Sequence, residues 1–160
     1  MPRISARWGK KKTYIAGGLI GILGNLLFYF GQADQIAYLF IVNAVCMFSV
    51  GFSLVLVASM QADTIEYAQW KTGKRSESIV TSVGTFTAKV STAIAGAAAG
   101  YGLTLFGYVP NGLQSASTLQ GINLMISIFP LIGICLSLII ISLYTLTEKK
   151  YAEIVADLHG

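Results

Sequence analysis

The sequence predicts an all-α membrane protein with four transmembrane helices. Hydrophobic residues make up 54% of the 160 residues and charged residues 11%, whereas soluble domains carry about 25% charged residues. The apolar residues form four long runs, and the basic residues gather in alternate connections between these runs. Mean hydropathy is +0.67. This composition excludes an ordinary water-soluble domain, and it has too much apolar surface for a disordered chain.

Each apolar run is long enough to cross a bilayer as a helix, which takes roughly 17–25 residues. The runs cover residues 14–30, 36–60, 79–106 and 119–146, within a transmembrane region of residues 14–147. The first, second and fourth runs contain no charged residue, and the third contains one. None alternates in the way that β-barrel strands do, so we expect four helices.

The basic residues predict the orientation of the chain. All but Lys89 lie in a basic segment at residues 1–13, a charged loop at residues 61–78, or the tail at residues 148–160. Four crossings place these three segments on one side, and the positive-inside rule makes that side cytoplasmic, with both termini. The tail has apolar residues at helical spacing. It is either a short amphipathic helix on the cytoplasmic face or a continuation of the fourth span.

Lys89 is the strongest functional signal because it lies well inside the third apolar run. A lysine at the bilayer centre costs about 2.5–3.5 kcal/mol on insertion scales. Ser82, Thr85 and Thr92 share its helix face by spacing, so the four residues form a polar stripe. The stripe either lines a hydrophilic path or holds a buried ion pair that fixes helix register. No acid lies within the four spans, so a carboxylate partner must come from outside them.

The loop at residues 61–78 contains a second group of charges. Asp63 and Glu66 would share a helix face, and Arg75 follows the turn at Thr72-Gly73. These charges are either a solvated loop that obeys the positive-inside rule or a network that closes the cytoplasmic side in one conformational state.

Other classes of function find little support in the sequence. The two carboxylates have no nearby histidine, and we find no catalytic constellation, so we expect no enzyme. Cys46 and Cys135 fall inside apolar runs and form no metal site, so we expect neither a metal nor a cofactor. No basic stripe interleaved with aromatic residues predicts nucleic-acid binding.

The chain resembles the glycoside–pentoside–hexuronide:cation symporter family, which includes the melibiose, xyloside and glucuronide permeases. The most specific part is the run Asp63-Thr-Ile-Glu-Tyr-Ala-Gln-Trp-Lys-Thr-Gly-Lys-Arg-Ser-Glu-Ser, followed by Ser82-Val-Gly-Thr-Phe-Thr-Ala-Lys89. The loop Gly107-Tyr-Val-Pro-Asn-Gly is also similar. The resemblance covers nearly the whole chain.

The resemblance implies the carboxy-terminal part of a major-facilitator-type transporter of 12 helices. It implies that Lys89 and Thr85 lie on the sugar and cation pathway, and that Asp63, Glu66 and Arg75 are cytoplasmic gating charges. It also implies a sugar or glycoside substrate, a coupling cation (Na⁺, H⁺ or Li⁺), a missing amino-terminal half as partner, and a bacterial plasma membrane.

Two hypotheses follow. In the first, the chain is the carboxy-terminal part of a sugar:cation symporter that works by alternating access and is inactive alone. In the second, it is a small membrane oligomer or relic polypeptide that transports nothing, held together through glycine-rich helix faces.

Overall fold

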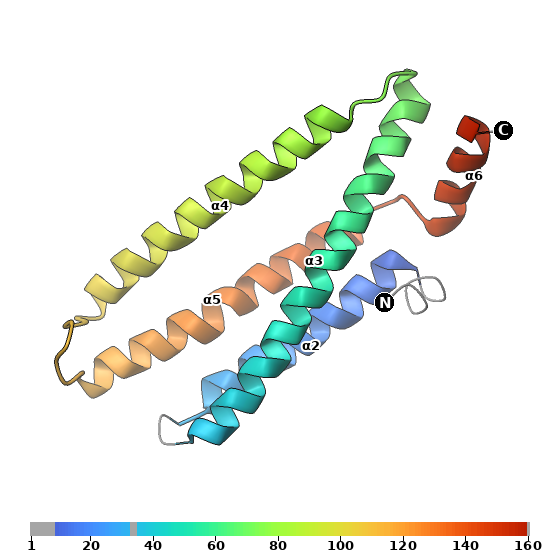
Figure 1. The fold of residues 1–160 in the computed structure, drawn as a ribbon. Helices are drawn as coiled ribbons and strands as arrows, with labels where there is room; N and C mark the ends of the chain where they lie inside the picture. Colours follow the sequence, from blue (N-terminus) through green and yellow to red (C-terminus); the bar gives the residue numbers. More distant parts are fainter. Residues whose placement is uncertain (1–8, 33–34, 160) are drawn as a thin grey trace.

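The computed structural model describes residues 9–32 and 35–159 of the chain. Within these residues all regular structure is helical (Figure 1). The helices are α2 (Lys10–Phe30), α3 (Ile36–Thr72), α4 (Glu77–Leu105), α5 (Ala116–Ser142) and α6 (Glu148–His159).

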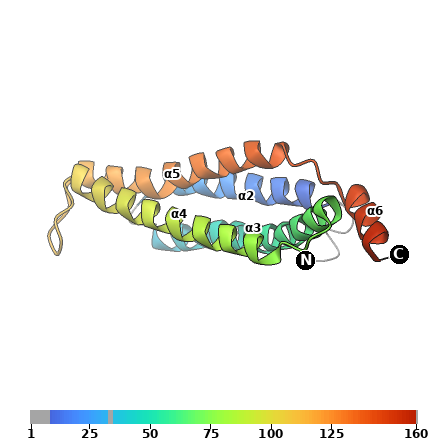
Figure 2. The same cartoon turned by 90° about the horizontal axis from the view of Figure 1, so that it is seen from above.

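Helices α2, α3 and α5 form the packed part of the protein, with α2 against both of the others (Figures 1 and 2). Glycines on α2 allow this close approach. A Cβ atom on Gly18 would lie 2.7 Å from Leu138 Cδ2, and one on Gly21 would lie 2.5 Å from Ser49 Oγ. The Ser49 hydroxyl donates a hydrogen bond of 2.7 Å to the Gly17 carbonyl. The glycines of α2 therefore serve packing within the chain.

Helix α4 is set apart from this group along most of its length (Figure 1). It meets α3 near Gly84, where a Cβ would lie 2.6 Å from Gln61 Nε2, and it meets α5 near Gly102, beside Met125. Every residue from 85 to 101 is exposed. The middle of α4 therefore has no covering from the rest of the described chain.

The segment at residues 61–78, which we predicted to be a loop, is helical as far as Thr72. Gly73 ends α3 in a left-handed conformation with φ of 68°, and its N–H donates to the Gln69 carbonyl. Glycine adopts this conformation without the penalty of a Cβ. Only residues 73–76 separate α3 from α4.

The fourth predicted span, at residues 119–146, differs at both ends from α5. The helix starts at Ala116, where the Ser115 hydroxyl accepts a hydrogen bond from the Thr118 N–H, and it ends at Ser142. The Lys11 ammonium donates to the Ser142 and Tyr144 carbonyls beyond that end. Of the two possibilities for the tail, the structure has a separate helix, α6, rather than a continuation of α5.

Three helices of the described chain, α2, α3 and α5, are long and apolar enough to cross a membrane. The mean hydropathy of their most apolar stretches is 1.5, 2.3 and 2.8. Helix α4 is not among them, although its 29 residues give ample length. Its composition explains this difference from our expectation of four spans, because α4 is rich in Ser, Thr, Gly and Ala and carries Lys89.

Candidate functional site

The predicted polar stripe lies on the uncovered part of α4. Ser82, Thr85, Lys89 and Thr92 are all exposed in the structure. The Thr85 hydroxyl donates to the Thr81 carbonyl and the Thr92 hydroxyl to the Ala88 carbonyl, each at 2.9 Å. These bonds leave the oxygen lone pairs of both threonines available to accept hydrogen bonds.

Lys89 has no ion-pair partner among the residues that the structure describes, where the two ion pairs are Lys10–Asp63 and Arg75–Glu77. Gly96 lies two helical turns further on the same face, and nothing lies within 4 Å of a Cβ placed there. The face that carries Lys89 is thus open to whatever surrounds this chain.

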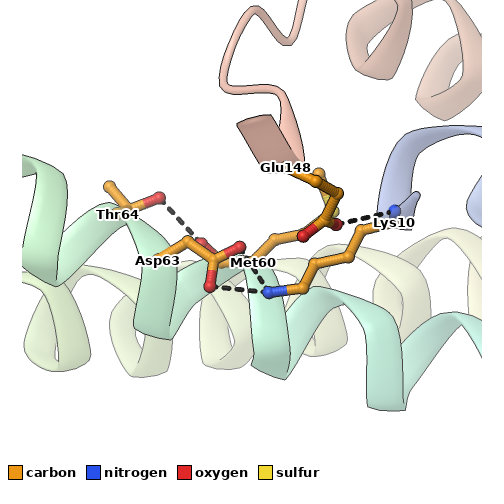
Figure 3. A network of polar contacts seen from close by, with 5 residues as sticks. All are labelled: Lys10, Met60, Asp63, Thr64 and Glu148. Atoms are coloured by element: carbon orange, nitrogen blue, oxygen red, sulfur yellow. Dashed lines mark hydrogen bonds and ion pairs between the residues drawn. The ribbon is translucent and has the colours of Figure 1, made fainter. Parts of the chain in front are cut away.

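A second group of polar residues lies where the amino end of α2 meets α3 and α6 (Figure 3). The Lys10 ammonium contacts both carboxylate oxygens of Asp63, at 2.7 and 2.6 Å. The Lys10 backbone N–H donates to Glu148 Oε1 at 3.0 Å. One lysine therefore connects three helices.

Asp63 is buried, with 5% of its surface exposed. It lies beyond the predicted membrane segment at residues 36–60. Burial raises the pKa of its carboxyl, the Lys10 ammonium opposes that rise, and the nearby Glu148 and Glu66 carboxylates add to it. The cluster has three carboxylates around the Lys10 charge, so its electrostatic balance depends on this lysine.

Glu66 and Arg75 lie in different surroundings. One Glu66 carboxylate oxygen, Oε2, is buried without a hydrogen-bond partner in the described structure. The Glu66 carboxylate beside the Tyr151 hydroxyl, together with burial, raises the pKa of Tyr151. Arg75 lies past the end of α3, where its Nε is 3.0 Å from Glu77 Oε2 and both side chains are exposed. The structure thus groups Asp63 with Glu66 but leaves Arg75 apart.

The sequence analysis missed Lys10, Glu148 and Tyr151 as members of this cluster. Lys10 is separated from Asp63 by 53 positions and from Glu148 by 138. Such distant pairings follow from helix packing and leave no local pattern. The one available signal was the first turn of the tail, where Glu148 and Tyr151 share a helix face.

The described residues contain no group of three or more His, Cys, Asp or Glu side chains that could hold a metal ion. Cys46 and Cys135 are both free. The polar groups present are suited to hydrogen bonding and to ion pairing. The Lys89 stripe lies on one helix, whereas the Lys10 cluster joins α2, α3 and α6.

Comparison with known proteins identifies the family. The model of the family described as MFS/sugar transport protein matches residues 1–148. A putative 2,3-dihydroxypropane-1-sulfonate exporter of Salmonella typhimurium is 39% identical over 100% of this chain and 35% of its own length. The glucuronide carrier protein homolog of Escherichia coli is 34% identical over 99% of this chain and 35% of its own length.

The isoprimeverose transporter of Lactiplantibacillus pentosus is 36% identical over 98% of this chain and 33% of its own length. The chain thus spans about a third of the length of these curated relatives. Their names describe transporters and not enzymes, and the apolar helices place the chain in a membrane. The resemblance inferred from the sequence motifs is confirmed, and the chain belongs to the MFS/sugar transport protein family.

Proposed function

We propose that this chain forms the carboxy-terminal part of a symporter that couples the movement of a sugar or sugar derivative to a cation. The relatives are named for a glucuronide, isoprimeverose and a sulfonated polyol. Two of these names are of sugar derivatives, and the third is a three-carbon diol, so the shared chemistry is a hydroxylated substrate. Within that class, a glycoside, a pentoside or a hexuronide is the substrate proposed here. The chain corresponds to about a third of each relative, so it acts with the remaining two thirds and transports nothing alone.

The observation that carries this proposal is the position of Lys89. Its ammonium group lies in the middle of a long helix, on a face that the described chain leaves open. A lysine facing lipid at that depth is costly, so the face must meet water, substrate or a carboxylate from elsewhere. The hydroxyls of Thr85 and Thr92 lie on the same face and can bind substrate hydroxyls.

The proposed mechanism is alternating access in a plasma membrane with both termini cytoplasmic. Helix α4 serves as a fourth crossing, because 29 residues exceed the length that a bilayer requires. Its polar face then lines the path between the two halves of the transporter. The Lys10–Asp63 pair lies at the cytoplasmic end of α2, where Asp63 and Glu66 act as gating charges, while Arg75 pairs outside that cluster.

A chimera tests the proposal. This chain replaces the corresponding carboxy-terminal third of the Escherichia coli glucuronide carrier homolog, and uptake of a labelled glucuronide is measured in cells. We expect coupled uptake by the chimera and a fall of about ten-fold or more for Lys89→Ala, because a charge on the pathway is removed. Lys149→Ala, in the exposed first turn of α6, is the matched control. Normal coupled uptake by Lys89→Ala at equal membrane abundance contradicts the assigned role.

The alternative is a small oligomer that does not transport. The open glycines Gly96 and Gly100 on α4 favour it, because a second copy could cover them. The DNA upstream of Met1 distinguishes the two: further in-frame spans with intramembrane acids support the symporter. A stable oligomer of the chain alone, with no such upstream sequence, supports the alternative.

A further inference from the structure

Helix α6 contacts the rest of the protein through few groups, most of them polar. It has 12 residues and follows a connection without regular helix at residues 143–147. It lies beside the amino end of α2 and the carboxyl end of α3 (Figures 1 and 2). An isolated helix of this length is marginal in water, so tertiary contacts must supply its stability.

Helix α6 contacts the last turns of α3, which extends to Thr72. Among residues 148–158 of α6, Ile154 alone is buried, with 2% of its surface exposed, and α6 packs on α3. The Trp70 indole N–H donates to Asp157 Oδ2 at 3.3 Å. The Lys150 ammonium lies 5.9 Å from the centre of the Tyr67 ring. Apart from Ile154, these groups are partly or fully exposed, and such contacts are individually weak.

The hydrogen bond and the cation–π contact that join α2 to α6 in the described structure both involve Lys10. Its backbone N–H holds Glu148, its ammonium holds Asp63, and the same ammonium lies 5.0 Å from the centre of the Tyr151 ring. Glu148 and Glu66 are close enough to Asp63 to raise the pKa of its carboxyl. Without the Lys10 charge, the docked position of α6 would bring Glu148 against two carboxylates, and no other cation of residues 9–32 and 35–159 forms an ion pair there.

We propose that α6 is a clasp, by which we mean a helix that docks reversibly across the ends of α2 and α3. Its helix forms only while it is docked on α3, and docking requires Lys10 to be paired with Asp63. A rearrangement that separates the cytoplasmic ends of α2 and α3 therefore releases and unfolds the carboxy-terminal segment. Whether the tail is helical or unfolded therefore indicates whether the ends of α2 and α3 are together or apart. This property does not depend on the identity of the substrate or on transport.

Hydrogen–deuterium exchange of the α6 amides tests the proposal on the full chain in lipid nanodiscs. We expect Lys10→Met to speed exchange at residues 151–158 by about ten-fold or more, because the docked state loses its neutralising charge. Ile154→Asp should have the same effect by removing the apolar anchor. Ala156→Asp, at an exposed position of the same helix, is the matched control and should leave exchange within about three-fold of the parent chain.

Two further variants separate charge from shape. Lys10→Arg keeps the cation and should keep α6 protected, and Glu148→Gln in the Lys10→Met background should restore part of the protection by relieving repulsion. Unchanged protection of α6 in Lys10→Met, with α2 and α3 still protected, overturns the coupling. Equal loss of protection in Ala156→Asp and Ile154→Asp overturns the docking role of Ile154. Neither result bears on uptake by the chimera.

Discussion

Helices α2 and α4 have similar small residues but opposite surroundings. On α2, the glycines lie under the side chains of α3 and α5, so that a single added methyl group at Gly21 would collide with Ser49. On α4, the space around Gly96 is empty. The covered helix has no charge in its buried part, whereas the open helix carries Lys89. Small residues alone therefore do not distinguish a packed helix face from an exposed one, and the charge on the open face of α4 is the second difference between the two helices.

Leucine substitutions at glycines of α2 and α4 should show the largest difference between the two helices. Gly21→Leu should destabilise the chain by about 3 kcal/mol or more, at the upper end of overpacking penalties, because the site lacks room even for a Cβ. Gly96→Leu should leave the stability of the isolated chain unchanged, since no atom of the chain lies within 4 Å of a Cβ there.

Resistance to unfolding by SDS, followed by circular dichroism, measures both variants. Equal losses would mean that α4 is covered in the isolated chain as closely as α2.

Removal of Lys10 tests the end of the packed helices at which α2 meets α3 and α6. Lys10→Ala should cost about 1–3 kcal/mol, which is less than the loss of a fully buried ion pair, because the side chains of Lys10 and Asp63 keep exposures of 17% and 7%.

The loss should depend on pH. Without Lys10, burial and the nearby carboxylates raise the pKa of Asp63 further, so the folded state binds a proton that the unfolded state releases. Stability should therefore rise as pH falls through the raised pKa of Asp63. Unfolding of Lys10→Ala at pH 7.5 and at pH 5 checks the sign, with Lys149→Ala as the control. This account is contradicted if lowering the pH from 7.5 to 5 reduces the stability of Lys10→Ala more than it reduces the stability of Lys149→Ala.

The sequence predicted the helical class and the positions of the apolar segments because helix length and hydropathy are local properties. It placed the turn at Thr72-Gly73, where α3 ends, but it ended the apolar span at Met60. The helix continues past that point because residues 61–72 are less apolar yet contain no Gly or Pro. The sequence did not predict that Lys10 pairs with Asp63, because that contact arises from the packing of two helices. Lys89 was found from sequence because a single charge in an apolar run is conspicuous, and the described residues contain no ion-pair partner for it.

The central claim is that the face of α4 with Lys89 meets water inside the assembled transporter. Thr92 lies on that face, and Ile94, two residues away, lies on nearly the opposite side at similar depth. In the chimera, with Cys46 and Cys135 replaced by serine, Thr92→Cys and Ile94→Cys are compared for their rate of reaction with a membrane-impermeant thiol reagent. The account predicts that the cysteine at position 92 reacts much faster and that substrate slows it. Equal rates at the two positions, or a faster reaction at position 94, would contradict the claim.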